Sequence, residues 1–231
     1  MRSAKAVFIK QAKDTLKNKV MLIQYLLFPL MAYVMTELVA RADETIPDSI
    51  FVTMFAALFT GMTPLMATNT AIAEDKECKA LRLLVMAGVK PYEYLIGIGG
   101  FMFLICLLIS VLFAVIGGFA GVMFLKFVLV LMLGSTASAL LGSIVGIFSK
   151  NQQSATATAT PLFLVLAFCP MLAMFNETIA NMSRFLFTFQ VNVLVNDLQG
   201  NLMQPLWVIL VNIAVFVLLF AFAYKKKGLR G

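Results

Sequence analysis

Six long apolar runs dominate this sequence and limit what it can fold into. They cover about 20–40, 50–73, 95–117, 127–148, 155–175 and 205–224. An α-helix needs about 20 apolar residues to cross the hydrocarbon core of a bilayer. The chain is 61% hydrophobic and only 13% charged, whereas roughly a quarter of the residues in a soluble domain are charged. We therefore expect an all-α integral membrane protein with six transmembrane helices.

The Lys and Arg residues are concentrated in alternate connections between these runs. Residues 1–19 hold six of them, 74–94 hold four, 149–153 hold one, and the tail after residue 224 holds four. The connections on the other side hold only Arg41, Lys126 and Arg184. One side therefore holds fifteen Lys and Arg residues and the other holds three. Because cytoplasmic loops are enriched in Lys and Arg, this asymmetry predicts that both termini are cytoplasmic. The predicted location is the cell (plasma) membrane, with multiple passes.

The segment before the first run has the pattern of an amphipathic helix. Over residues 1–19 and into the first run, an apolar residue recurs every four positions, whereas the lysines share another face. The apolar positions are Ala4, Phe8, Ala12, Leu16 and Val20. Such a helix suits the plane of the inner membrane surface, with its lysines at anionic headgroups. The alternative is that the segment serves only as a basic topology anchor.

The connection 176–204, before the last run, is too apolar for a free loop and too interrupted for a span. Irregular backbone at membrane depth must be covered by protein, because lipid cannot hydrogen-bond to it. We expect this extracellular segment to be half-inserted into the outer surface of the membrane.

Several classes of chemistry are disfavoured by what the sequence lacks. It has no His, which is the commonest general base and metal ligand, so no catalytic residue and no metal site is predicted. None of its 14 Gly residues is followed by Lys, and a Walker A loop needs that pair. Ion-driven transport and intramembrane catalysis are disfavoured because carboxylates are nearly absent from the runs.

One face of the fourth run consists of small residues. They recur every four positions, at Gly134, Ser138, Gly142 and Gly146. Small residues allow the backbones of membrane helices to approach closely. This face is predicted to pack against another helix, either within the subunit or across a dimer.

The segment 74–94 separates the second and third runs and carries a helical pattern. Acidic residues favour a helix N-terminus, so Glu74, Asp75 and Glu77 predict that a short helix begins here. Gly88 and Pro91 then predict its end. Its apolar stripe suits either the lipid surface or a groove in a cytoplasmic protein.

These features together resemble type-2 ATP-binding-cassette (ABC) exporter permeases. The resemblance covers the topology of the whole chain and is most specific at "EDKECKALRLLVMAGVKPYEYLIG". The residues that match the family pattern are Glu74, Glu77, Leu83, Leu84, Pro91, Glu93, Tyr94, Leu95 and Gly97. The last loop departs from the pattern, because "FTFQVNVLV" stands where an Asn-Pro-like element is common.

The resemblance implies that residues 1–231 form a single type-2 transmembrane domain. The segment 1–19 would be an interfacial helix, 74–94 the coupling-helix loop, and 176–204 a re-entrant segment. Coupling to the ATPase would then involve Glu74, Glu77, Ala80, Leu81, Leu84, Val85, Gly88, Pro91 and Glu93.

The implied function is the permease subunit of an ATP-driven exporter of an amphipathic peptide, drug or lipid. Its partners would be two cytoplasmic ABC ATPase subunits and a second permease copy or paralogue in the bilayer. No nucleic acid is expected to bind. This chain would bind no cofactor itself, because ATP and Mg²⁺ would sit on the ATPase. The alternative is a non-transporting membrane partner of an ATPase, acting in sensing or in immunity against a toxin or antibiotic.

Overall fold

The computed structural model describes residues 2–42, 46–80, 83, 86, 88–89, 91–173, 175–200 and 202–227. Every regular element among these residues is a helix. Six helical segments are long and apolar enough to cross a membrane. They cover Lys19–Ala40, Ser49–Glu77, Ile96–Ile116, Gly121–Phe148, Gln152–Ala173 and Met203–Ala223. The predicted all-α class with six spans is confirmed.

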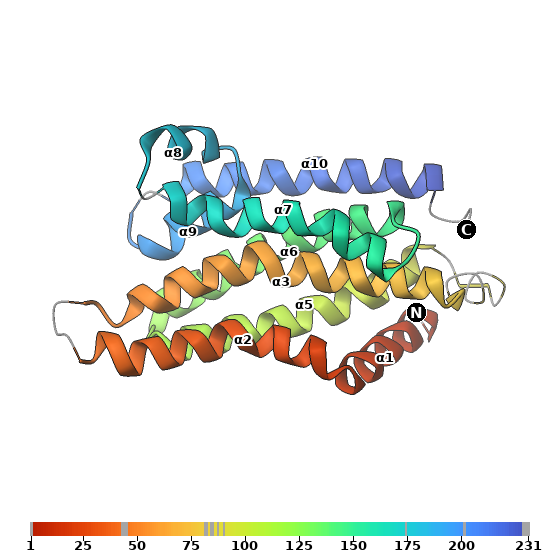
Figure 1. Ribbon diagram of the computed structural model, residues 1–231, viewed down its shortest axis with the longest axis horizontal. Coiled ribbons are helices and arrows are strands. Elements are labelled where there is room, and N and C mark those ends of the chain that lie inside the picture. Colours follow the sequence, from red (N-terminus) through yellow and green to blue (C-terminus); the bar gives the residue numbers. More distant parts are fainter. Residues whose placement is uncertain are drawn as a thin grey trace.

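The helices follow the chain in a simple order (Figure 1). Their bounds are α1 Arg2–Lys17, α2 Lys19–Met35, the π-helical turn η1 Thr36–Ala40, α3 Ser49–Glu77, α5 Pro91–Ile116, α6 Gly121–Phe148, α7 Gln152–Ala173, α8 Glu177–Ser183, α9 Phe187–Asn196 and α10 Met203–Lys227. The long helices lie side by side along the bundle, and α1 and the last turn of α10 lie at the same end of it. We call this the termini end.

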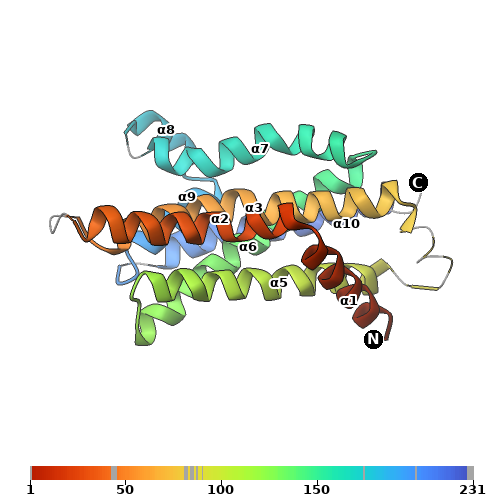
Figure 2. The same ribbon diagram turned by 60° about the horizontal axis from the view of Figure 1, so that its bottom comes forward.

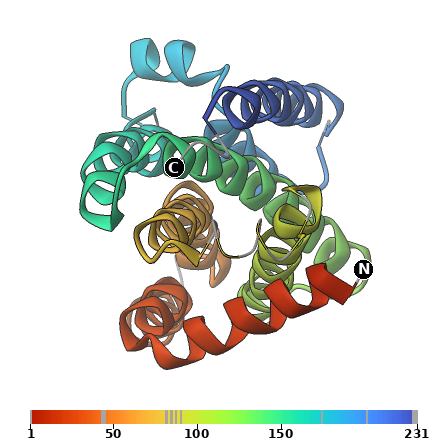
Figure 3. The same ribbon diagram turned by 90° about the vertical axis from the view of Figure 1, so that its right-hand side faces the viewer.

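The second span, α3, forms the centre of the bundle. Within an 18-residue apolar stretch of α3, 72% is buried, whereas the corresponding share for the last span, in α10, is only 11%. Figure 3 shows α3 between α2 and α7, and α3 also packs against α6. The contact with α7 is close, because a Cβ built at Gly61 would lie 2.9 Å from the backbone of Ala167. The central position of α3 brings its last turn within reach of several other elements.

The first helix, α1, turns away from the direction of the spans and packs against α5 (Figure 2). Asn18 separates α1 from α2, and its side chain accepts hydrogen bonds from the backbone N–H groups of Val20 and Met21 at the start of α2. Such a side chain satisfies donors that a helix N-terminus leaves unpaired. The chain therefore changes direction at Asn18 and continues as the first span.

The face of α1 that packs on protein is not the apolar face that was predicted to lie in lipid. Val7, Gln11 and Thr15 are buried, whereas Leu16 is exposed. The reason is that α1 packs on protein at a place where α5 is narrow. A Cβ built at Gly97 would lie only 2.6 Å from Val7. Shape, rather than the apolar period alone, selects this face.

The connection before the last span contains two short helices, α8 and α9, at the end opposite the termini (Figure 1). Asn176 begins α8 by accepting hydrogen bonds from the backbone N–H groups of Thr178 and Ile179. The side chains of Phe187, Val191 and Leu194 in α9 are buried against α3, α6, α7 and α10. Protein therefore covers α9, and its depth in the membrane stays a prediction.

Candidate functional site

The last turn of α3 carries the charged residues that the sequence assigned to the start of a new helix. That assignment is wrong, because α3 continues through Glu77. The amide of Cys78 still donates to the carbonyl of Glu74 at 2.9 Å, and Lys79 then adopts a left-handed conformation with φ of 55°. The physical reason is that no Gly or Pro lies between Pro64 and Gly88, and Ala, Glu and Lys favour helix.

Asp75 is the most enclosed charge in this turn, with only 4% of its surface exposed. One of its carboxylate oxygens forms an ion pair with Lys10 of α1. The other accepts a hydrogen bond of 2.8 Å from the Tyr94 hydroxyl of α5. A buried carboxylate is costly unless it is paired and hydrogen-bonded, and both its oxygens have partners here. Asp75 therefore joins α3 to α1 and to α5.

The ionic state of Lys10 agrees with this pairing. Partial burial alone would lower the pKa of Lys10, but the hydrogen bond and charge of Asp75, helped by Asp14, outweigh it and raise the pKa. The Lys10 ammonium also lies 3.4 Å from the Asp14 carboxylate. A raised lysine pKa means that the amine stays charged at neutral pH. Lys10 and Asp75 therefore form an ion pair at neutral pH.

Lys76 reaches the end of α6. Its ammonium donates hydrogen bonds of 2.7 Å to the carbonyls of Ile147 and Ser149. Carbonyls at a helix C-terminus lack partners within the helix and form the negative end of its dipole. A lysine is therefore well suited to this position.

Glu77 reaches the start of α7. Its carboxylate accepts a hydrogen bond of 3.0 Å from the backbone N–H of Gln152, the first residue of α7. Negative charge is favourable at a helix N-terminus. Together, Asp75, Lys76 and Glu77 contact α1, α5, α6 and α7. We call these three residues the α3 clamp.

The described residues between α3 and α5 are 78–80, 83, 86 and 88–89, and they follow the α3 clamp in the chain. Leu83 and Met86 are 61% and 68% exposed. Gly88 has a φ of 78°, which glycine adopts without strain, and Ala80 is half-buried. This stretch also lies outside the six spans. It therefore exposes apolar side chains where no membrane span covers them.

The nine residues assigned to ATPase coupling come from more than one element, and their role stays a prediction. Glu74 and Glu77 belong to α3, and Pro91 and Glu93 belong to the first turn of α5. Leu81, Leu84 and Val85 lie outside the described residues. Sequence reasoning missed Met86, and it gave the Lys10–Asp75 pair no role. The unbroken helical composition through Glu77 was the available signal for the longer α3.

A comparison with known protein families identifies the chain. The sequence model of the ABC-2 family transporter proteins matches residues 5–225. The chain belongs to the ABC-2 transporter family. It is thus the membrane permease subunit of an ABC transporter. No curated protein matches it.

Membership of the ABC-2 family indicates where this permease lies and with what kind of protein it associates. It is a multi-pass membrane protein, and its family implies association with an ABC ATPase. ABC-2 permeases normally lack an ATPase site of their own. Within the described part of the chain, no group of three His, Cys, Asp or Glu residues could hold a metal ion.

The small residues of α6 in this ABC-2 permease lie against α3. A Cβ built at Gly146 would lie 2.9 Å from the Asn69 carbonyl oxygen, and one at Gly142 would overlap the Leu65 carbonyl. A Cβ built at Gly134 would overlap the side chains of Thr60 in α3 and Val191 in α9. Ser138 is fully buried. The contact therefore lies within one subunit.

Proposed function

We propose that this ABC-2 permease couples ATP hydrolysis on a cytoplasmic ATPase to export of an amphipathic substrate. The observation that carries the proposal is the exposure of Leu83 and Met86 outside the membrane spans. Exposed apolar side chains on a short segment are typical of a surface that fits a partner's groove. This segment is the docking element for the ATPase, which binds ATP and Mg²⁺.

The α3 clamp supplies the route from that docking element into the bundle. Residues 78–80 follow directly after the clamp, and α5 begins at Pro91 on the other side of the loop. A movement of the loop acts on α3 and α5 together, because Tyr94 and Asp75 are hydrogen-bonded. The clamp then shares that movement with α1, α6 and α7. Packed helices transmit such displacements because their interfaces are not easily compressed.

The termini end is the cytoplasmic end of the bundle in the plasma membrane. Supporting this, fifteen of the 18 Lys and Arg residues belong to the segments on that side. The last turn of α3, which leads into the docking element, lies at the same end of the bundle as α1 (Figure 1). The docking element therefore faces the compartment that holds ATP.

Two permeases and two ATPases form the transporter. Supporting a second copy or a paralogue, α7 exposes Ser154, Thr156 and Thr158 within a membrane span. The Thr158 hydroxyl donates to the Ser154 carbonyl at 2.9 Å, so this hydroxyl tolerates lipid. Small hydroxyl-bearing faces are nevertheless common where membrane helices associate. We place the partner subunit and the substrate path along this face of α7.

The test compares two apolar-to-acidic substitutions at opposite ends of the molecule. Met86→Asp should prevent co-purification of the ATPase or abolish substrate-stimulated ATP hydrolysis, because a charge would meet an apolar groove. Met182→Asp is the matched control, since Met182 is 74% exposed on α8. It should leave both readouts unchanged.

Retention of both readouts at wild-type level in Met86→Asp and in Leu83→Asp would refute the docking element. ATPase binding with no transport of any peptide, drug or lipid tested in vesicles would instead indicate a non-transporting role in sensing or immunity. The two results are distinguishable because binding and transport are measured separately.

A further inference from the structure

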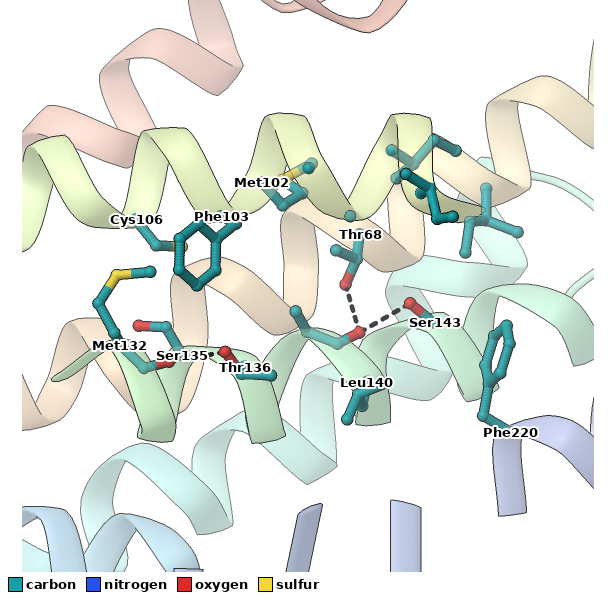
Figure 4. A pocket seen from close by; sticks show the side chains of 16 residues that line it. Thr68, Met102, Phe103, Cys106, Met132, Ser135, Thr136, Leu140, Ser143 and Phe220 are labelled. Atoms are coloured by element: carbon teal, nitrogen blue, oxygen red, sulfur yellow. Dashed lines mark hydrogen bonds between the residues drawn. The ribbon is translucent and has the colours of Figure 1, made fainter. Parts of the chain in front are cut away.

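A groove of about 520 Å³ lies between α5 and α6 and is closed at its back by α3 (Figure 4). Small-molecule sites in proteins commonly enclose roughly 300–1,000 Å³. Met102, Phe103 and Cys106 of α5 form one wall, and Met132 and Leu140 of α6 form the other. Phe220 of α10 lies at one end of the groove. This space belongs to neither the α3 clamp nor the exposed face of α7.

We propose that this groove binds one acyl chain of an anionic phospholipid from the leaflet at the termini end. The proposal does not depend on the ATPase or on the transported substrate.

The first support is the chemistry of the lining. The hydroxyls of Thr136 and Ser143 donate to backbone carbonyls of their own helix at 2.7 and 2.8 Å. Thr68 donates to the carbonyl of Ala139 at 3.0 Å, whereas the buried Ser135 hydroxyl has no hydrogen-bond partner among the described residues. The groove therefore offers an occupant a mainly apolar surface, in which Ser135 is the one lining hydroxyl of the described residues without a partner. An alkyl chain suits such a surface better than water does.

The second support is the length and depth of the groove. Along α5 it extends from Ile96 to Cys106, and the ten steps between these residues rise about 15 Å at 1.5 Å each. The span itself begins at Ile96, so the groove occupies the half of the span next to the termini end. One leaflet contributes about half of a hydrocarbon core of roughly 30 Å. The groove thus matches one lipid tail in length.

The third support is access from the membrane. Ile96 and Phe103 line the groove and are 61% and 54% exposed. A void beside packed helices loses dispersion contacts, and the surrounding lipid can restore them. The mouth therefore opens where acyl chains are the available occupant.

The fourth support is charge next to the groove. Gly100 lines the groove, and a Cβ built there would lie 3.8 Å from the Phe8 ring of α1. Lys5, three residues before Phe8, is exposed. An exposed lysine on an interfacial helix attracts anionic headgroups. Lys5 therefore puts an exposed cation on the helix that packs against the α5 wall of the groove.

Fluorescence quenching by lipids with brominated acyl chains tests the proposal in detergent micelles. Trp207 is the only Trp of the chain, so Trp207→Phe gives a background without native indole signal. Phe103→Trp then places one indole in the groove, and Leu218→Trp is the control, on a lipid-facing residue that is 71% exposed. Brominated phosphatidylglycerol should quench F103W saturably, at a lipid-to-protein ratio at least tenfold below that for L218W.

Two further arms test the site and the headgroup. Ala139→Phe and Thr136→Phe each fill the groove, and either should abolish the saturable quenching of F103W. Ala214→Phe adds the same ring to an exposed position of α10 and should not. Lys5→Gln should bring the titration with phosphatidylglycerol close to that with brominated phosphatidylcholine.

The proposal is overturned if F103W and L218W quench in parallel, because the groove indole would then report only bulk lipid. It is also overturned if F103W resists quenching at every lipid ratio, which would mean that protein covers the groove. Equal titrations with the two headgroups in the presence of Lys5 would exclude an anionic lipid.

Discussion

Lys10 and Asp75 form an ion pair between the first helix and the end of the second span, although 65 residues separate them in sequence. Asp75 is buried, whereas 38% of the Lys10 side chain is exposed. The pair therefore lies at the edge of the bundle, with one partner inside and one reaching it from the surface.

Breaking this ion pair should destabilise the bundle more than breaking an ion pair between two exposed side chains would. Lys10→Met leaves the Asp75 carboxylate buried, with Tyr94 as its remaining partner among the described residues. The expected loss lies between an exposed pair and a fully buried one, roughly 1–3 kcal/mol. Thermal unfolding in detergent of Lys10→Met, Asp75→Asn and the double variant measures it. Additive effects of the two substitutions would show that the side chains do not interact.

The raised pKa of Lys10 predicts how the stabilisation by this ion pair depends on pH. Because the pKa of Lys10 is raised in the folded protein, its contribution is complete below the unfolded lysine value of about 10.4. It is lost only as the pH rises through the folded value. The difference in unfolding temperature between wild type and Lys10→Met should therefore stay constant from about pH 6 to about pH 9. A difference that shrinks across this range would contradict the assignment.

The contact between α6 and α3 should not tolerate a side chain at Gly142. A Cβ there would overlap the Leu65 carbonyl and the Thr68 hydroxyl, and the carbonyl is backbone that cannot rotate away. Gly142→Ala should cost roughly 1–3 kcal/mol. Gly99→Ala is the control, because nothing lies within 4 Å of its Cβ position. Equal unfolding temperatures for the two variants would argue against close packing at Gly142.

The orientation can be tested with an impermeant thiol reagent on intact cells. In a background with Ser at Cys78, Cys106 and Cys169, Asp48→Cys should react from outside. Lys150→Cys should react only after the membrane is opened. Both positions are exposed and lie at opposite ends of the bundle. Labelling of Lys150→Cys in intact cells would reverse the proposed topology.

The assembly can be tested at the hydroxyl face of α7. In the same background without native cysteines, Thr158→Cys should form a crosslink between two permease copies, and Leu218→Cys on α10 should not. The native mass of the complex in detergent should correspond to two permeases and two ATPases. An active monomeric permease without the Thr158→Cys crosslink would contradict this arrangement.

The sequence by itself determined the class of protein and the number of spans. Both depend on local quantities: hydrophobicity over about 20 residues requires a helix in lipid, and the unequal distribution of lysine and arginine predicts the orientation of such helices. The small face of α6 was equally visible, because four-residue spacing needs no partner to be recognised. The helix that packs on this face could not be predicted from the sequence. Close packing against α3 and close packing against a second copy both require the same small residues.

Only the tertiary structure decided where α3 ends and what its charges contact. Acidic residues before a polar loop suit the start of one helix or the last turn of another, and packing around Asp75 selects the second. The α3 clamp contacts four other helices because α3 lies in the middle of the bundle. Its contacts are Lys10 of α1, Tyr94 of α5, Ile147 at the end of α6 and Gln152 at the start of α7. The groove between α5 and α6 has the same origin, since residues of α3 and α10 complete its lining. Sequence periodicity describes one helix at a time, and the spaces between helices depend on all of them.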